Sequence, residues 1–372
     1  MRVAIICRPF VFHGGLETAT AGLIEEFVRQ GYDLHLFSPP GQLPVRGATL
    51  HRLPVIPYPS PARLISFVLA ARLGVRRDRF DVIQSHERSL AQDIYRAGEG
   101  CHRAYLAIKA RYLGPARRLA LRGNPSHLLL LALERRIFTS GSTRRIVAIS
   151  RQGREEIRRL YGVPESRLAV IYNGVDQERF HPDHRKRFGP AIRAEFGIPR
   201  DAWVILMVGS GFERKGLGPL IEGFARFSDR GAWLLVVGKG SPAPYRALAE
   251  RLDVAERLVW AGPRPDVERF YAAANAVALP SLYEPFGNVH LEALAAGLPV
   301  LASGRSGGAE VVTHGETGWI LENPEDAEAI ANGLEALRNA EPTLVTERAR
   351  AAVRPFTFVS QVRAFADLYR TL

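Results

Sequence analysis

The sequence predicts an α/β protein made of two tandem domains, each with a doubly wound parallel sheet. The chain has 372 residues, more than one ordinary hydrophobic core accommodates. Short apolar runs typical of buried strands alternate with segments of helical apolar spacing. A polar stretch at residues 177–187 divides this alternation into two series. We therefore place the first domain at residues 1–177 and the second at residues 178–356, and expect a final helix at residues 357–372 to return to the first domain.

The first domain alternates short strands with helices. We expect its strands at residues 3–7, 34–37, 81–86, 145–150 and 169–172. A glycine loop follows the first strand and leads into a helix. Ligands of such sheets bind where strands end and helices begin, so Gly14 and Gly15 could let the backbone approach a ligand and offer amides to an anion. A tight turn explains the glycine pair equally well.

The second domain repeats the pattern more regularly. Its strands are expected at residues 203–208, 233–237, 258–261, 276–279 and 300–302. Its helices are expected at residues 217–228, 244–252, 265–274, 287–296 and 324–337.

Two glutamates flank the start of one of these helices. Pro285 keeps Glu284 out of the helical region, so Glu284 is expected on the loop that follows the strand at residues 276–279. Glu292 is expected within the next helix, which Gly297 ends. Between them, the amides of Phe286, Gly287 and Asn288 could form an anion site. Two acids beside an anion site suit a ligand that has both hydroxyls and phosphate, such as a sugar nucleotide.

The loop from Gly209 to Gly216 presents two adjacent cations at the end of a strand. It is not a Walker loop, because no Ser or Thr follows Lys215-Gly216. Its glycine spacing, and the lack of an acid at the end of the next strand, exclude the dinucleotide fingerprint and argue against an NAD-dependent oxidoreductase. Arg214 and Lys215 could neutralise a diphosphate; the alternative is a surface loop with incidental charge. The chain contains no Asp-x-Asp and no histidines at metal-ligand spacing, so we expect no metal and no cofactor.

Positive charge is concentrated in one part of the chain. The formal net charge is +12, and residues 101–160 hold fourteen Lys and Arg but only three acids. This balance predicts a phosphate-rich partner: nucleic acid, an anionic membrane or a phosphorylated acceptor. In residues 103–136 Tyr and Leu interleave with the cations, as in an interfacial helix, although a solvated basic face is the alternative. We find neither a helix-turn-helix nor an aromatic platform there, so nucleic-acid binding is only a remote alternative.

Two further observations concern the cellular compartment. Cys7 and Cys101 imply no disulfide framework. The first apolar run is too short for a signal peptide, and no window approaches the ~18 apolar residues of a membrane span. We therefore expect a cytoplasmic protein.

The glutamate pair also carries a resemblance to a known family. Glu-Pro-Phe-Gly, with Glu292 eight positions after Glu284, looks like the paired-glutamate motif of retaining glycosyltransferase family 4. Residues 214–216, residues 173–176 and the Gly14-Gly15 pair fall where that family has its phosphate loop, interdomain turn and N-terminal glycine loop. The likeness covers essentially the whole chain. Residues 209–216 and 95–106 further resemble the lipopolysaccharide core glucosyltransferase I group.

The resemblance implies a GT-B fold: two Rossmann-like domains facing each other across a cleft, with the acceptor bound by the first and the donor by the second. It implies that Glu292 holds the ribose and that Glu284 binds the donor sugar beside the reacting bond. It also implies a histidine near that sugar, for which we choose His102, with His86 as the alternative. The remaining donor-binding residues that it implies are Arg214 and Lys215 on the diphosphate, Gly14 and Gly15 capping it, and Gly209, Phe286, Gly287 and Asn288.

The activity that the resemblance implies is metal-independent transfer of a hexose with retained anomeric configuration. We expect glucose from UDP-glucose, an acceptor such as the lipopolysaccharide inner core, and peripheral binding to the inner membrane through residues 103–136. Synthesis of another glycan, glycolipid or exopolysaccharide is the alternative. We predict front-face attack, in which the leaving phosphate oxygen takes the proton of the acceptor hydroxyl.

Overall fold

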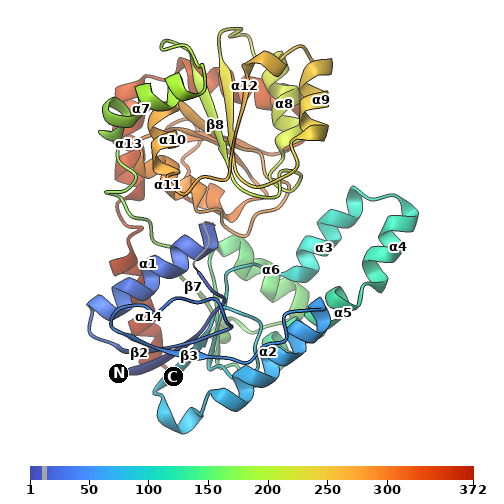
Figure 1. The fold of residues 1–372 in the computed structure, drawn as a ribbon, viewed down its shortest axis with the longest axis vertical. Helices are drawn as coiled ribbons and strands as arrows, with labels where there is room; N and C mark the ends of the chain where they lie inside the picture. The colour runs from blue at the N-terminus through green and yellow to red at the C-terminus, as the bar shows by residue number, and fades with distance from the viewer. Residues whose placement is uncertain (11–14) are drawn as a thin grey trace. The chain divides into compact units, whose positions relative to one another are not determined.

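The computed structural model describes residues 1–10 and 15–372 (Figure 1). Its contacts divide the chain into two compact units. Among the described residues, the N-terminal unit comprises 1–10, 16–173 and 358–372, and the C-terminal unit comprises 15 and 174–357. The units thus separate between Asn173 and Gly174, a few residues before the boundary expected from the sequence. Gly14 lies outside the described residues.

The N-terminal unit contains a seven-stranded sheet in the order β3-β2-β1-β4-β5-β6-β7, with every pair parallel. The strands are β1 (Arg2–Ile6), β2 (Asp33–Ser38), β3 (Ala48–Arg52), β4 (Val82–Ser85), β5 (Ile94–Ala97), β6 (Arg145–Ala148) and β7 (Leu168–Val170). The central strands are apolar at successive positions because helices cover both faces of the sheet.

The helices of this unit divide between those faces and a projecting arm. They are α1 (Gly15–Arg29), α2 (Ser60–Gly74), α3 (His102–Arg111), α4 (Pro115–Gly123), α5 (Pro125–Thr139), α6 (Arg151–Tyr161) and α14 (Phe358–Tyr369), with 3-10 turns η1 (Arg77–Arg79) and η2 (Glu165–Arg167). Ile5 packs in one core with Phe27 of α1 and Phe365 of α14. Ile6, on the opposite face, packs with Phe67 of α2. The last helix of the chain therefore completes the core of the N-terminal unit.

The C-terminal unit contains a six-stranded parallel sheet in the order β10-β9-β8-β11-β12-β13. Its strands are β8 (Val204–Val208), β9 (Trp233–Val237), β10 (Leu258–Gly262), β11 (Ala276–Leu279), β12 (Val300–Ser303) and β13 (Gly318–Leu321). Its helices are α7 (His184–Glu195), α8 (Leu217–Arg226), α9 (Ala243–Arg251), α10 (Glu268–Ala273), α11 (Val289–Ala295), α12 (Ala327–Asn339) and α13 (Pro342–Val353), with η3 (Ala255–Arg257) and η4 (Gly307–Val311).

Both sheets have a topological switch point, which is where doubly wound sheets bind ligands. In the C-terminal unit the strand order reverses between β8 and β11, so the loops after these strands are neighbours. These are the loop that carries Arg214 and Lys215 and the loop that carries Glu284. In the N-terminal unit the order reverses between β1 and β4, whose following residues include Arg8 and His86.

Several elements lie outside the sequence-based expectations: β3, β5, β13, α2 and α13. In β5 the fully buried Arg96 interrupts the apolar pattern that marks a strand. Helix α7 begins within the stretch expected to be a linker. The sequence did not predict a helix there, because residues 184–187 are polar and Pro190 lies inside the helix. It is held by close packing instead: a Cβ at Gly189 would lie 2.7 Å from the Ala272 carbonyl of α10.

Helices α3, α4 and α5 form an arm that projects from the sheet of the N-terminal unit (Figure 1). We call residues 102–139 the basic arm. Neither α3 nor α4 buries any residue, and α5 is buried only near its end, through Leu133, Glu134, Ile137 and Phe138. No helix in the described part of the chain is long and apolar enough to span a bilayer.

The placement of α14 gives a stability prediction. Phe365 is fully buried against Phe27 and Tyr369, so Phe365→Ala is expected to destabilise the N-terminal unit by about 3–5 kcal/mol. All four tryptophans belong to the C-terminal unit. Urea unfolding should therefore shift when followed by circular dichroism, which reports on both units, and shift much less when followed by tryptophan fluorescence.

Val359→Ala, at a site on α14 with 43% exposure, is the matched control and should leave both transitions in place. Equal effects of the two variants would contradict a core role for α14.

Candidate functional site

The loop of Glu284 is fixed to the turn after β12. Glu284 forms an isolated parallel bridge with Ser306, and its carbonyl accepts a 2.9 Å hydrogen bond from the Gly307 amide. The Ser306 hydroxyl donates to the Phe286 carbonyl at 3.1 Å. The backbone on both sides of Glu284 is therefore held before any ligand is considered.

Two cations converge on the Glu284 carboxylate. Lys215 Nζ lies 2.5 Å from Oε2, and Arg214 Nη1 donates to the same oxygen at 2.6 Å. Burial by itself raises the pKa of Glu284, but Lys215 and then Arg214 outweigh it and lower the pKa to about 2. Two cations share one carboxylate, so this cluster keeps a net positive charge, and Arg214 leaves a third of its side chain exposed.

Glycines let the two loops approach each other. Gly216 has φ +76°, and a Cβ there would lie 2.0 Å from the Pro280 carbonyl oxygen. Gly287 has φ +80°, and a Cβ there would lie 2.9 Å from Cγ of Glu284. Both positions require the left-handed conformation that glycine adopts without strain. Any larger residue would separate the cations from the glutamate loop.

Glu292 is buried on α11 beside Tyr271, whose hydroxyl donates to Oε2 at 2.5 Å. Burial raises the pKa of Glu292, and the tyrosine hydrogen bond offsets part of that effect. Tyr271 is itself packed edge-on against Phe180, with ring centroids 5.2 Å apart. A rigid aromatic neighbour thus orients this carboxylate.

The backbone amides of the site differ from expectation. The Gly209 amide already donates to the Val237 carbonyl at 2.9 Å, so it is not available to a ligand in this conformation. Helix α11 begins at Val289 rather than Gly287, which leaves Phe286, Gly287 and Asn288 before the helix rather than in its first turn. The cationic side chains, not a long helix start, supply the positive charge.

His290 was missed by the sequence reasoning. It is fully buried, and its Nδ1 lies 2.7 Å from the Gly287 carbonyl, which places the ring hydrogen on Nδ1. Burial lowers its pKa to about 4, so the ring is neutral at physiological pH. Its Nε2 has no partner among the described residues. The available signal was a second polar residue, two positions before Glu292, in a helix whose remaining residues are apolar.

The two histidines considered for the sugar site have different surroundings. His102 is the first residue of α3, and its Nε2 lies 3.1 Å from Nδ1 of His127 on α5. Burial, and secondarily Arg88, lower the pKa of His102 to about 4. The structure thus places His102 within the basic arm. His86 follows β4 directly, at the switch point, and is buried.

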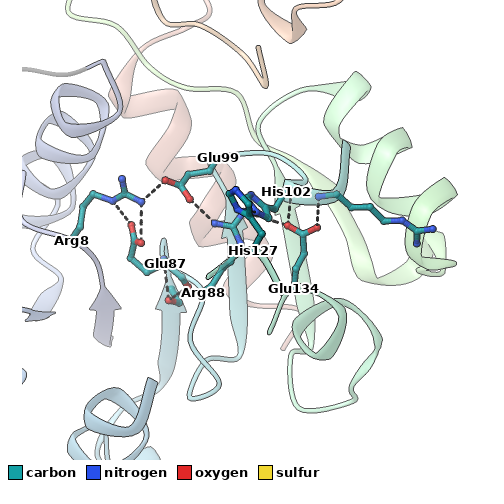
Figure 2. Close-up of polar contacts among 9 residues, drawn as sticks. Arg8, Glu87, Arg88, Glu99, His102, His127 and Glu134 are labelled. Carbon is teal, nitrogen blue, oxygen red and sulfur yellow. Dashed lines mark hydrogen bonds and ion pairs between the residues drawn. The ribbon is translucent and has the colours of Figure 1, made fainter. Parts of the chain in front are cut away.

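A charged network joins the strand ends of the N-terminal unit to the basic arm (Figure 2). Arg8, after β1, binds Glu87 at 2.6 Å and also pairs with Glu99. Arg88 binds Glu99 at 2.5 Å and Glu134 at 3.3 Å. We call these five residues the arginine–glutamate network. The sequence reasoning missed it, although polar residues directly after strands were the available signal.

Comparison with known proteins places this geometry in a family. Residues 13–179 match the profile described as Glycosyltransferase Family 4, and residues 189–352 match the profile described as Glycosyl transferases group 1. The chain belongs to glycosyltransferase family 4. Its two parallel-sheet domains are those of the GT-B fold, as the sequence predicted.

Relatives of this family-4 chain extend over most of its length. Lipopolysaccharide glucosyltransferase WaaG of Escherichia coli K12 is 25% identical over 345 residues, which are 91% of this chain and 89% of WaaG. The crystal structure of WaaG has a TM-score of 0.82 at 25% identity and covers 99% of each chain. The uncharacterized glycosyltransferase MJ1607 of Methanocaldococcus jannaschii is 27% identical over 90% of this chain and 88% of its own.

A third relative matches a shorter part. D-inositol 3-phosphate glycosyltransferase of Corynebacterium glutamicum is 33% identical over 241 residues, which are 60% of this chain and 56% of that protein.

The Glu284 cluster makes a testable electrostatic prediction. Lys215→Met removes one of two cations while burial remains, so the Glu284 pKa should rise from about 2 toward its usual 4.5 or above it. A carboxyl with a depressed pKa stabilises the fold above its unfolded pKa and loses this contribution as pH falls through its folded pKa. The contribution of Glu284 to the free energy of unfolding should therefore be smaller in Lys215→Met than in the wild type. It should also be lost at a higher pH as the solution is acidified.

Carboxyl ¹³C NMR, with the Glu284 signal assigned through Glu284→Gln, measures the shift. Lys239→Met, at an exposed position on the neighbouring loop, serves as the control. An unchanged Glu284 titration in Lys215→Met would refute the assignment of the depressed pKa to Lys215.

Proposed function

We propose that the chain transfers a hexose from a nucleotide diphosphate sugar to a lipid-linked saccharide, with retained anomeric configuration and without a metal. The observation that supports this best is the Glu284–Lys215–Arg214 cluster at the switch point of the C-terminal unit, with Glu292 on the following helix. The whole-length likeness to WaaG favours glucose, from UDP-glucose, and the lipopolysaccharide inner core as acceptor.

The positive cluster suits the leaving group of this reaction. Breaking the anomeric C–O bond develops negative charge on the departing diphosphate, and preorganised cations stabilise that charge. Arg214 and Lys215 outnumber the single carboxylate they share, so an incoming diphosphate adds the missing negative charge. The loss of one such contact typically costs about 3 kcal/mol of barrier.

The same cations support a metal-independent reaction. Where Mg²⁺ serves a diphosphate, it neutralises phosphate oxygens, and a guanidinium with an ammonium can do this instead. The described residues contain no group of three or more His, Cys, Asp or Glu placed as metal ligands. Activity measured with and without a chelator tests the proposal directly.

The charge and pairing of Glu284 bear on how the anomeric configuration would be retained. A carboxylate with a pKa of about 2, held by two cations, is a weak nucleophile and a weak base. We therefore assign it to holding the hydroxyls of the donor sugar, and not to a covalent intermediate. The acceptor hydroxyl then attacks on the face that the diphosphate leaves, and a phosphate oxygen takes its proton. A product with inverted anomeric configuration would overturn this mechanism.

Nucleotide binding should depend on Glu292. Glu292→Ala removes the carboxylate proposed to hold the ribose, so the thermal shift produced by UDP should disappear. A ligand at about one hundred times its Kd stabilises a protein by about 2.7 kcal/mol, which is readily measured. Each variant is compared with its own unliganded Tm, because the substitution itself creates a cavity.

Glu328→Ala changes an exposed glutamate on α12 and should retain the full UDP response. A full response in Glu292→Ala would remove Glu292 from the nucleotide site.

The basic arm suits an anionic membrane surface. Its exposed residues combine cations with Tyr112, Leu119 and Leu128, which are 38%, 73% and 53% exposed. The single acid among residues 102–139 is Glu134, which is buried. Each Lys or Arg near an anionic surface contributes about 1 kcal/mol, and the apolar side chains can enter the headgroup region. We propose that this arm holds the enzyme peripherally at the membrane that carries its acceptor.

Vesicle binding tests this surface. Replacing Arg117, Arg118 and Arg122 on α4 with Gln should weaken binding to vesicles of phosphatidylglycerol and phosphatidylcholine by about 3 kcal/mol, roughly a hundredfold. Raising the salt concentration should weaken wild-type binding in the same direction. Vesicle co-sedimentation measures both effects.

The matched control replaces three exposed arginines of the C-terminal unit, Arg200, Arg251 and Arg348, with Gln. It removes the same net charge from a different surface. Equal weakening in both triple variants would show a general charge effect and would contradict docking through the basic arm.

A second acceptor class deserves testing because of one comparison. The D-inositol 3-phosphate glycosyltransferase relative is more identical to this chain than WaaG, although over a shorter stretch. An acceptor panel containing inner-core lipopolysaccharide and inositol phosphate separates the two. Transfer to inositol phosphate alone would replace the lipid-linked acceptor in this proposal.

A further inference from the structure

The ring of His290, the second residue of α11, lies against two glycines from different segments of the C-terminal unit. A Cβ at Gly287, in the Glu284 loop, would lie 3.1 Å from its Nδ1. A Cβ at Gly308, in η4, would lie 2.3 Å from the same nitrogen and 2.2 Å from the Phe286 carbonyl oxygen. The two glycines therefore leave the space that the imidazole fills, at the place where the two segments meet.

His290 donates twice to one carbonyl oxygen. Its backbone amide lies 3.0 Å from the Gly287 oxygen, and its ring Nδ1 lies 2.7 Å from the same atom. Because a carbonyl oxygen only accepts, the ring hydrogen is on Nδ1. The peptide group is planar, so holding this oxygen fixes the orientation of the whole peptide between Gly287 and Asn288.

Filling space does not by itself account for an imidazole at this position. The residue is fully buried, and its Nε2 has no hydrogen-bond partner in the described part of the chain. A buried acceptor without a partner costs free energy, which a leucine of similar size would avoid. The bond from Nδ1 to Gly287 is the contribution that a leucine cannot make.

The turn at Gly287 lies directly beneath the Glu284 side chain. Gly287 has φ +80°, and a Cβ there would lie 2.9 Å from Cγ of Glu284. A rotation of the Gly287 backbone would therefore displace the side chain that crosses it. Lys215 and Arg214 bind the far end of that side chain at 2.5 and 2.6 Å, so a small displacement would lengthen both contacts.

The Glu284 loop is attached to two neighbouring elements. The turn after β12 holds the carbonyls of Glu284 and Phe286. The carbonyl of Gly287 is held instead by His290, on the helix that also carries Glu292. The imidazole thus ties the loop of one glutamate to the helix of the other.

We propose that His290 is a positioning residue for sugar transfer. Its Nδ1–H and its ring hold the turn at Gly287, and this turn keeps the Glu284 side chain beside Lys215 and Arg214. The role rests on the proposed function, in which Glu284 binds the hydroxyls of the donor sugar. It extends that function by assigning a residue between the two glutamates of the motif. The imidazole needs no contact with substrate, because it acts through Gly287.

Three substitutions separate the hydrogen bond from the packing. His290→Asn places an amide N–H near the position of Nδ1 and should keep the bond to Gly287. His290→Gln carries its amide one bond further out, near the position of Nε2, and His290→Leu fills the space without a donor. We expect kcat for UDP-glucose hydrolysis and for transfer to fall about tenfold in the Leu and Gln variants, and much less in the Asn variant.

The loss should appear in kcat and not in nucleotide binding. UDP lacks the transferred sugar, so the thermal shift that it produces should persist in all three variants. A merely structural role would lower kcat, the UDP response and Tm together, without rescue by His290→Asn. Equal kcat values in the Asn, Gln and Leu variants, or loss of the UDP response, would overturn the positioning role.

Titration of Glu284 tests the positioning without any reaction. If the turn relaxes, the carboxylate moves away from its two cations while it remains buried. Its pKa should therefore rise from about 2 in His290→Leu and stay near that value in His290→Asn, as measured by carboxyl ¹³C NMR. If the wild type neither hydrolyses UDP-glucose nor transfers sugar, the proposed function fails, and this titration still decides the role of His290. An unchanged titration in His290→Leu would overturn that role in an active enzyme as well.

Ile330→Val is the matched control for lost stability. Ile330 is fully buried on α12, in the core of the same unit, and loss of one methylene group there should lower Tm. The substitution should leave kcat unchanged. A fall in kcat as large as that of His290→Leu would attribute both effects to stability and would refute the proposal.

The tautomer of His290 provides a last check. Long-range ¹⁵N–¹H NMR of the wild type at neutral pH should show a neutral ring with its hydrogen on Nδ1. Hydrogen on Nε2 would leave Gly287 without the ring donor and would overturn the assignment.

Discussion

The site in the C-terminal unit depends on one buried carboxylate shared by two cations. Isolated burial would drive Glu284 toward its protonated form, and only Lys215 and Arg214, at 2.5 and 2.6 Å, keep it charged. That arrangement requires two loops, from different strands, to meet at short range. The left-handed glycines at 216 and 287 allow the approach, and the turn after β12 holds the glutamate backbone. Removing one of these supports would weaken the pairing of a desolvated carboxylate.

The two units both contain a doubly wound parallel sheet, but the charges at their switch points differ. In the C-terminal unit the switch point has more cations than acids, and Glu292 lies beside it on a rigid aromatic support. In the N-terminal unit the two arginines of the arginine–glutamate network are balanced by its three glutamates. An excess of positive charge favours a negatively charged ligand at the first switch point, and the second switch point has no such excess. The difference concerns the charges at each switch point and not the net charge of each unit, because the excess positive charge of the chain is concentrated in residues 101–160 of the N-terminal unit.

The sequence predicted the elements with strong local signals. The β11–α11 segment is flanked by proline and glycine, and the loop after β8 is rich in glycine, so both loops and their charged residues were found. The contact of Arg214 with Glu284 was not, because seventy positions separate the two residues and local spacing says nothing about such pairs. Strand β5 was not predicted because Arg96 interrupts its apolar pattern. The position of Glu99 just after that strand was therefore not predicted either. His290 looked like one more residue of an apolar helix. Residues that break a local pattern were thus the ones missed: His290 lies beside the Glu284 loop, and Arg96 and Glu99 lie in and just after β5 of the N-terminal unit.

Glu134 shows how the basic arm combines its surface charge with its attachment to the domain. As the only acid among residues 102–139, it could have reduced the charge of the exposed face. It is instead 1% exposed, and it accepts the His102 amide at 2.6 Å and the Arg103 amide at 3.2 Å at the start of α3. It also pairs with Arg88, next to the end of β4. The acid therefore fixes the arm internally while its outer face stays cationic. The attachment of the arm thus involves Glu134 and the buried apolar end of α5, whereas its surface charge includes the arginines of α4, so different residues carry the two properties.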